Sequence, residues 1–192
     1  MNMRAQIKPA LVFLIVFTTL LGVVYPFAVT GIAQIVFPDQ ANGSLIQRDN
    51  LILGSRLIGQ SFDDPRYFWG RPSGTSPFPD NAASSSGSNL GPTNPALMEM
   101  IQARIAALKA ADPQNDLPIP LDLVTASASG LDPHISLAGA LYQASRVARA
   151  RGVPEEEVLA LVQTYTQSRQ FGILGEPRVN ILLLNLALDG IK

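Results

Sequence analysis

Hydrophobic residues are concentrated in one block near the beginning of this 192-residue chain. Thirty consecutive residues after Lys8 have no formally charged side chain, and 10–25 (ALVFLIVFTTLLGVVY) is almost wholly apolar. About 20 apolar residues cross a bilayer as a helix. A core helix would instead carry polar residues on its outer face at every turn, and this block does not. The pattern predicts a transmembrane anchor helix over residues 10–37.

A cleaved secretory signal is the main alternative for this block. Such a signal has an apolar region of roughly 7–15 residues followed by a small-x-small cleavage site. Gly31 and Ala33 resemble that site, but the apolar run before them is too long. Pro26 is expected either to kink the helix or to mark its outer end, with Tyr25 and Phe27 at the membrane interface.

The charges that flank the block predict its orientation. Arg4 and Lys8 precede it, whereas Asp39 follows it and no basic residue comes close behind. Basic flanks stay on the cytoplasmic side of a span. We therefore expect a single-pass membrane protein whose residues 1–9 are cytoplasmic and whose residues 38–192 form an extracytoplasmic domain.

Three helices are predicted in that domain, each from a start signal followed by apolar residues at helical spacing. Asn94-Pro95 and Asp132-Pro133 both combine a capping residue with a proline suited to the first turn. The third helix starts at Pro154 with three glutamates in its first turn, where acids suit the helix dipole. The predicted helices cover 94–111, 132–152 and 154–165.

Weaker patterns suggest strands. Residues 44–46 and 51–53 flank a polar turn at 47–50, which suggests a hairpin, and 121–126 (LDLVTA) is a further candidate strand. The segment 179–188 (VNILLLNLAL) fits a buried strand or a helix, and the preceding proline favours a helix slightly. The predicted fold is a single N-terminal transmembrane helix plus one compact extracytoplasmic α+β domain.

Charge and composition narrow the function classes. Arg4 and Lys8 are two of the 14 basic residues, so residues 38–192 hold 12 bases against all 15 acids, a net charge of −3. The bases form no stripe, so nucleic acid is not an expected partner. The absence of cysteine removes thiol catalysis, zinc–thiolate sites and disulfides.

The sequence lacks the motifs of the common catalytic and transport sites. It has one histidine, His134, and no G-x-S-x-G elbow, no G-x-x-x-x-G-K-[ST] phosphate loop and no TVGYG filter. No Asp is followed by Lys, as a phosphorylated-aspartate pump would require. Asp63 and Asp64 are interpreted as turn residues rather than metal ligands. We therefore expect no catalytic, cofactor-binding or metal site in this chain.

Three loops of unusual composition remain as candidate docking surfaces: 62–76 (FDDPRYFWGRPSGTS), 86–97 (SGSNLGPTNPAL) and 124–136 (VTASASGLDPHIS). The consecutive aromatic residues in the first loop either offer aromatic area to a partner or fill the core of the domain. The candidate docking residues are Tyr67, Phe68, Trp69, Gly70, Arg71, Pro72, Ser88, Asn89, Leu90, Gly91, Pro92, Thr93, Asn94, Ser129, Gly130 and Asp132.

These loops, with three further segments in order, resemble the KdpC family, the C subunit of the bacterial high-affinity potassium-transporting ATPase. The further segments are 54–62 (GSRLIGQSF), 146–152 (RVARARG) and 175–188 (GEPRVNILLLNLAL). The similarity covers nearly the whole chain, including the N-terminal anchor.

The resemblance implies a location in the bacterial inner membrane, within a complex of four subunits. The partners would be a channel-like potassium-binding subunit, a P-type ATPase subunit and a very small accessory membrane subunit, together with the lipid bilayer. It further implies that the chain is needed for the assembly and stability of the complex. It also implies that the chain acts as a catalytic chaperone, which raises the ATP affinity of the ATPase subunit. ATP and potassium would then act at the level of the complex.

The alternative function is an independent membrane-tethered envelope hydrolase or ligand-binding module. A hydrolase needs a base, and His134 in the predicted capping region is the one histidine available.

Overall fold

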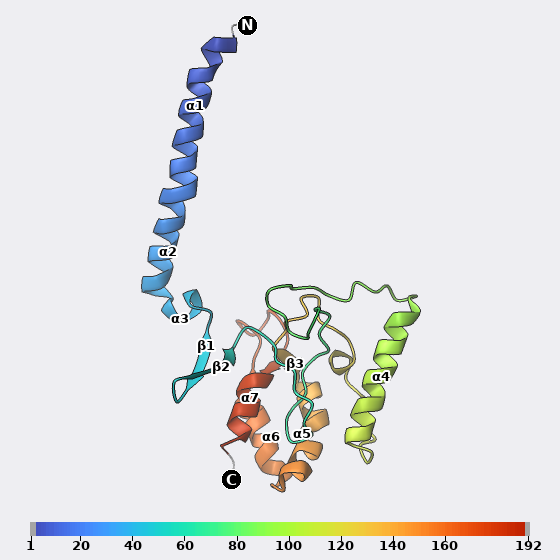
Figure 1. Cartoon of the computed structure of the whole chain (residues 1–192). Helices are drawn as coiled ribbons and strands as arrows, with labels where there is room; N and C mark the ends of the chain where they lie inside the picture. The colour runs from blue at the N-terminus through green and yellow to red at the C-terminus, as the bar shows by residue number, and fades with distance from the viewer. Residues whose placement is uncertain (1–2, 191–192) are drawn as a thin grey trace. The chain divides into compact units, whose positions relative to one another are not determined.

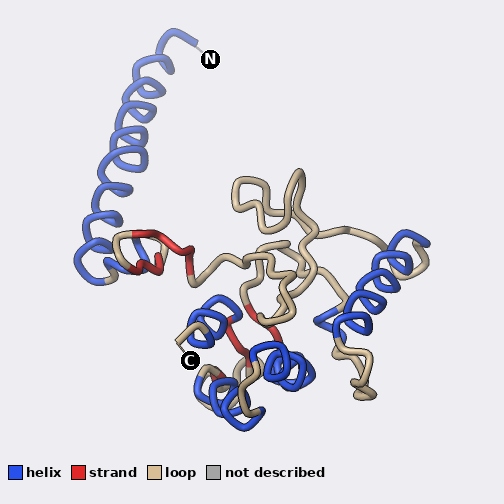
Figure 2. Tube along the Cα trace, turned by 60° about the horizontal axis from the view of Figure 1, so that its bottom comes forward, coloured by secondary structure: helices blue, strands red, loops and turns tan. Residues whose placement is uncertain are grey.

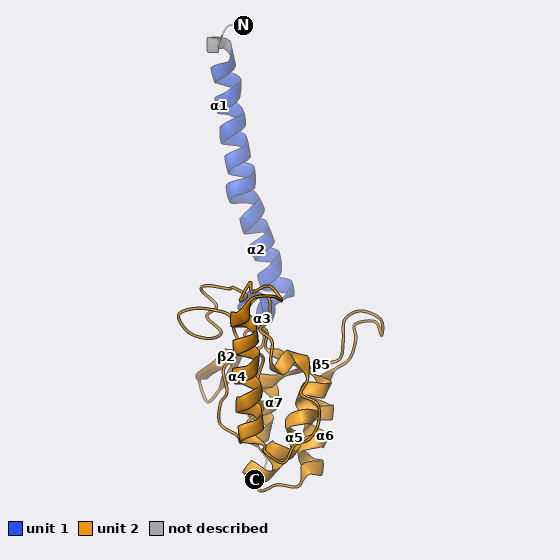
Figure 3. Cartoon of the chain, turned by 90° about the vertical axis from the view of Figure 1, so that its right-hand side faces the viewer, with its two compact units in different colours: residues 1–45 blue, residues 46–192 orange. Residues whose placement is uncertain are grey.

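The computed structural model describes residues 3–190 and separates into two compact units. Figure 3 colours them as residues 1–45 and residues 46–192. The first unit is mostly one long helix, and the second contains helices, short strands and long loops (Figure 1).

The long helix of the first unit has the properties expected of a membrane span. It runs without a break through α1 (Met3–Thr19), the π-helical turn η1 (Leu20–Val24) and α2 (Tyr25–Val36). Its stretch Gln6–Val36 has 31 residues with a mean hydropathy of 2.4, and none of the most apolar window is buried within the chain. By length and composition this stretch can cross a bilayer, and it does not serve as a core helix.

The π-helical turn η1 accommodates Pro26 within the helix. A proline inside a helix has no N–H to donate, and its ring clashes with the carbonyl four residues back, here that of Gly22. The widened turn contains Gly22, and the N–H of Tyr25 donates to the carbonyl of Leu20, five residues back. The helix ends before Pro38, and a short helix α3 (Pro38–Ala41) follows.

The predicted hairpin is confirmed. Strands β1 (Leu45–Arg48) and β2 (Leu51–Ser55) form a two-stranded sheet. Asp49 and Asn50 between them both have positive φ, 52° and 62°. Two such residues define the type I′ turn, whose twist matches that of a hairpin.

The second unit is built on three helices and a small antiparallel sheet. The sheet has the order β3-β5-β4, and Val179 in the central strand faces Ile135 on one side and Thr166 on the other. These elements are β3 (His134–Ser136), α5 (Leu137–Arg151), α6 (Glu155–Thr164), β4 (Thr166–Gln167), β5 (Arg178–Asn180) and α7 (Ile181–Leu188).

Two of the predicted helices are confirmed. Helix α4 (Pro95–Ala111) begins as expected, with the side-chain oxygen of Asn94 accepting from the N–H of Ala96 at 3.0 Å. Helix α6 follows Pro154 and carries the three glutamates in its first turn. Helix α4 packs lightly, since Leu108 is its one fully buried residue.

The predicted helix start at Asp132 is wrong. Residues 134–136 pair with β5, and α5 begins at Leu137, where the Ser136 hydroxyl accepts from the N–H of Gly139 at 2.9 Å. The end of this helix is as predicted: Gly152 takes the left-handed conformation with a φ of 69°.

Two other expectations are corrected. Residues 121–126 form no strand; they begin with the 3-10 helix η2 (Leu121–Leu123). The segment 179–188 is both strand and helix, because Asn180 ends β5 and caps α7 by accepting from the N–H of Leu183 at 3.1 Å.

The core encloses a short segment, residues 67–70, that belongs to no strand. Phe68 is fully buried and Trp69 is 7% exposed. The side-chain amide of Asn185 on α7 accepts from the N–H of Phe68 at 2.9 Å and donates to its carbonyl at 3.0 Å. Gln143 on α5 does the same for Trp69, at 2.8 Å and 3.0 Å. Two buried amides thus replace the missing strand partner.

Two arginines complete the enclosure of this segment. Arg146 on α5 donates to the carbonyls of Pro65 and Tyr67 at 2.5 Å and 3.1 Å, and its guanidinium lies 4.6 Å from the ring centroid of Trp69. Arg104 on α4 donates to the carbonyl of Gly70 at 2.9 Å. Burial lowers the pKa of Arg146 to about 10, so the group is still charged at neutral pH.

Replacing Asn185 by leucine should destabilise the domain strongly. The substitution keeps the shape of the side chain but leaves the buried N–H and carbonyl of Phe68 without partners. At about 1–3 kcal/mol for each of these two groups, the expected loss is about 2–6 kcal/mol. Urea unfolding of the full chain in detergent measures it through the fluorescence of Trp69, the one tryptophan.

Gln163→Leu is the control, because Gln163 is exposed on α6. It should leave the free energy of unfolding nearly unchanged. A loss below about 1 kcal/mol in Asn185→Leu, within the range of ordinary substitutions, would contradict the role given to this amide.

Candidate functional site

The structure brings three of the sequence-predicted loops together. Most of the chain between β2 and α4 is loop (Figure 2), and residues 71–76, 85–88 and 127–132 form what we call the loop cluster. The N–H of Ser86 donates to the carbonyl of Ser129 at 3.0 Å. The hydroxyl of Ser73 donates to the carbonyl of Gly130 at 2.7 Å. The cluster is therefore a hydrogen-bonded layer rather than slack chain.

Glycines allow these loops to pack backbone against backbone. A Cβ atom added at Gly130 would lie 2.5 Å from the carbonyl oxygen of Ser86. One added at Gly87 would lie 2.8 Å from the carbonyl oxygen of Ala128. Gly130 also has a φ of 68°, which side-chain-bearing residues rarely adopt. The Ser/Gly composition of these loops thus serves close packing between them.

Asp132 links the loop cluster to β3, because its carboxylate accepts from the N–H of His134 at 3.0 Å, and it is also paired with Arg71. The two side chains form an ion pair at 3.2 Å, and Arg71 also donates to the carbonyl of Ala126 at 3.2 Å. Burial alone would raise the pKa of Asp132, but hydrogen bonds from His134 and the charge of Arg71 lower it on balance. Asp132 is therefore an ionised, paired group and not the helix cap predicted for it.

The geometry does not assemble a hydrolase site around His134. Its Nδ1 lies 3.3 Å from a carboxylate oxygen of Asp132. The neighbouring hydroxyl of Ser136 donates to Asp122 at 3.1 Å and caps α5, so it is not available to the imidazole. In the described part of the chain, no three His, Asp or Glu side chains are grouped closely enough to share a metal ion.

The predicted docking residues from Ser88 to Asn94 form an exposed arm. Asn89 and 91–94 are exposed, and a Cβ at Gly91 would meet nothing within 4 Å. The N–H of Asn94 donates to the carbonyl of Gly91 at 3.0 Å, so the arm ends in a fixed turn at the start of α4. Since Ser88 belongs to the loop cluster, the arm is anchored at both ends.

An apolar groove borders this arm. It has a volume of about 360 Å³ and lies between α4 and residues 124–126. Its apolar walls come mainly from Leu97, Met100, Ile101, Ala107 and Val124.

The aromatic part of the predicted docking surface is corrected. Phe68 and Trp69 fill the core of the domain, which leaves no aromatic area of theirs for a partner. Tyr67 is half-buried, and its hydroxyl donates to Asp189 at 3.0 Å. Of the two alternatives left open by the sequence, core packing is the correct one for Phe68 and Trp69.

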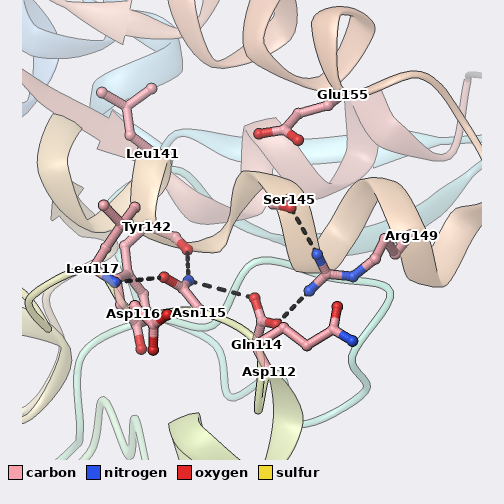
Figure 4. Close-up of a pocket in the computed structure, with 10 residues that line it drawn as sticks. All are labelled: Asp112, Gln114, Asn115, Asp116, Leu117, Leu141, Tyr142, Ser145, Arg149 and Glu155. Atoms are coloured by element: carbon pink, nitrogen blue, oxygen red, sulfur yellow. Dashed lines mark hydrogen bonds and ion pairs between the residues drawn. The ribbon is translucent and has the colours of Figure 1, made fainter.

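A polar cavity of about 400 Å³ lies where the loop after α4 meets α5 (Figure 4). Arg149 pairs with the buried carboxylate of Asp112 and donates to the hydroxyl of Ser145 at 2.9 Å. Asn115 donates to the carbonyl of Tyr142 at 2.8 Å. Burial, with the negative charge of Asp112, raises the pKa of Tyr142. The ion pair of Arg149 with Asp112 and the hydrogen bond of Asn115 join the loop to the helix.

Comparison with known proteins decides the family. The family described as "KdpC: K+-transporting ATPase, c chain" matches residues 7–190. The chain belongs to the KdpC family.

Relatives named "Potassium-transporting ATPase KdpC subunit" resemble it over nearly their whole length. The protein of Herpetosiphon aurantiacus is 64% identical, over 99% of this chain and 98% of its own. Those of Methylibium petroleiphilum and Sorangium cellulosum are 62% and 61% identical, over 98% and 99% of this chain and 98% and 100% of their own.

The polar groups that hold this KdpC-family domain together are not predicted by the sequence patterns. Asn185 lies in a segment predicted from its apolar residues, and Gln143 and Arg146 lie in a predicted helix. A signal for Asn185 did exist, because it is the lone polar side chain within the run 181–188. A polar group inside such a run must find a buried hydrogen-bond partner.

Gly130→Ala should destabilise this KdpC-family chain because it combines a left-handed φ with a 2.5 Å approach of Ser86. The expected loss in the free energy of unfolding is about 2–4 kcal/mol. Gly91→Ala is the matched control, since its Cβ enters open space, and it should change stability by less than about 1 kcal/mol. Equal effects of the two substitutions in urea unfolding would refute the close packing of the loop cluster.

Proposed function

We propose that this chain is a non-catalytic accessory subunit of an ATP-driven, high-affinity potassium uptake complex. Its role is to stabilise the assembly of a channel-like potassium-binding subunit with a P-type ATPase subunit, beside a small accessory membrane subunit. The observation that supports this best is the exposed arm 88–94, which is held on a rigid loop cluster and borders an apolar groove. A preorganised surface loses little conformational entropy on binding, which suits permanent docking.

In this proposal the long apolar helix anchors the chain in the bacterial inner membrane, with the N-terminus in the cytoplasm. Arg4 and Lys8 at the near end support that orientation. Residues 38–192 then lie outside the cytoplasm, where they face the outer surfaces of the partner subunits.

An effect of this subunit on ATP affinity would be transmitted through the complex. ATP is cytoplasmic, the proposed topology places 155 residues on the other side, and the sequence has no nucleotide motif. Such coupling requires that docking stabilise one conformation of the ATPase subunit over another.

Gly91→Arg should weaken assembly without unfolding the chain. The added side chain enters open space in the isolated chain but places bulk and charge in the middle of the arm. The measurement is the amount of each partner subunit that copurifies with the tagged chain from gently solubilised membranes. Ala110→Arg, at an exposed position of α4, is the control. Full recovery of the partners with Gly91→Arg would rule out docking through the arm.

A photoreactive ATP analogue should not label residues 38–192 of the intact complex in sealed vesicles when it is supplied on the cytoplasmic side. The ATPase subunit should be labelled in the same sample, which controls for binding. Labelled peptides from residues 38–192 would show direct nucleotide contact and overturn the proposal of coupling through the complex.

A further inference from the structure

The connection between β4 and β5 ends in an exposed apolar tip. We use this name for Phe171, Ile173 and Leu174, whose exposed fractions are 90%, 76% and 54%. Figure 3 shows the connection extending from β5, away from the helices. Isolated exposed apolar residues are ordinary, but a group of three large ones on a projecting turn is typical of an interaction site.

The tip has a defined conformation. Gln170 and Leu174 exchange two backbone hydrogen bonds, both of 2.9 Å, and the N–H of Ile173 donates to the carbonyl of Gln170 at 3.2 Å. Below them Arg169 and Glu176 form an ion pair at 2.5 Å. The three apolar side chains are therefore presented by a small hairpin and not by loose chain.

Phe171 is held in an unfavourable backbone conformation. Its φ is 53° and that of Gly172 is 75°, as in the two central residues of a type I′ turn. Asn and Gly are the usual residues there, whereas an aromatic residue with positive φ is an outlier. Strain of this kind persists at functional sites. The chain thus places its most exposed aromatic side chain at a position where folding alone would favour a small polar one.

We propose that the apolar tip is an anchor that inserts into an apolar pocket on another protein subunit of the transporting ATPase. This inference rests on the proposed function and names a contact of that assembly separate from the arm 88–94. Interface anchors are aromatic or large apolar side chains that fill a pocket and are ringed by polar groups. Here Phe171 is the anchor, and Arg169, Gln170 and Glu176 are the polar ring.

Charge and shape favour a protein pocket over lipid. Loops and helices that bind anionic membrane surfaces depend on unpaired basic residues. Here Arg169 is paired with Glu176, Arg178 donates to Gln167 at 3.2 Å, and residues 38–192 carry a net charge of −3. A fixed hairpin gives no gain in binding free energy for insertion into fluid lipid. It does lower the entropic cost of entering a pocket of defined shape.

The area of the tip argues against a dimer of this chain. A stable interface buries about 800 Å² on each partner, and three side chains supply only part of that. A tip that entered a groove of a second copy would also make a head-to-tail contact, which generates rings or open filaments rather than a closed pair. The tip fits best as one anchor within the larger interface of the complex.

The substitution Phe171→Asn tests the role of Phe171 in docking separately from any role in folding. Asn-Gly is the preferred pair for this turn, so the free energy of unfolding of the full chain should stay the same or rise. The affinity of the immobilised full chain for the purified remaining subunits should fall about tenfold or more, as for an interface anchor. Leu121→Ser is the control, because Leu121 is 72% exposed and lies in η2, outside the connection between β4 and β5; it should leave the affinity unchanged.

The outcomes separate this inference from the proposed function. A Phe171→Asn chain that binds the other subunits normally contradicts the apolar tip as an anchor and leaves the proposed function standing. A wild-type chain that binds none of them contradicts both. A Phe171→Asn chain that is markedly less stable than wild type shows that Phe171 serves the fold, and this also refutes the inference.

A photo-cross-linker at position 171 identifies what the tip contacts. With benzoylphenylalanine in place of Phe171 in native membranes, irradiation should give one adduct with another subunit of the complex. An adduct with a second copy of this chain, an adduct with lipid only, or no adduct would each refute the proposed pocket.

Discussion

The structure of the second unit depends on satisfying the backbone of one short segment, residues 67–70, in which Phe68 and Trp69 are buried. A buried peptide group without a hydrogen-bond partner costs about as much as a lost hydrogen bond, and this segment passes through the core without a neighbouring strand. Asn185, Gln143 and Arg146 supply its donors and acceptors from α7 and α5. These hydrogen bonds fix α5 and α7 against the segment.

That constraint also determines which surfaces are free for partners. Because Phe68 and Trp69 are committed to the core, the motif YFWGRPS contributes its aromatic residues to the fold and its last residues to the loop cluster. The cluster in turn fixes the start of the arm 88–94, in which Asn89 and residues 91–94 remain exposed. The long loop between β2 and α4 is thus held in one conformation by hydrogen bonds to residues 127–132.

Prediction from the sequence succeeds where the signal is local. The caps and prolines at the starts of α4 and α6, the glycine at the end of α5 and the turn of the hairpin each act over a few residues. It failed at β3 because a three-residue strand exists through its pairing with β5, about 45 residues away. The same non-local pairing moved the start of α5 from Asp132 to Leu137.

The candidate site was predictable only in part, for a similar reason. Composition identified loops that are rich in serine, glycine and asparagine, and three of these do meet. It did not distinguish Gly130, which another loop approaches to 2.5 Å, from Gly91, which faces open space. It also missed the exposed tip at Phe171, because a short apolar run resembles a buried one until the backbone around it is known.

The placement of residues 38–192 outside the cytoplasm is the claim on which docking depends, and cysteine labelling tests it directly. The chain has no cysteine of its own, so a single exposed substitution, Ser85→Cys, reports its side of the membrane. A membrane-impermeant maleimide should label Ser85→Cys in intact spheroplasts and Asn2→Cys only after lysis. The reverse pattern would contradict the account.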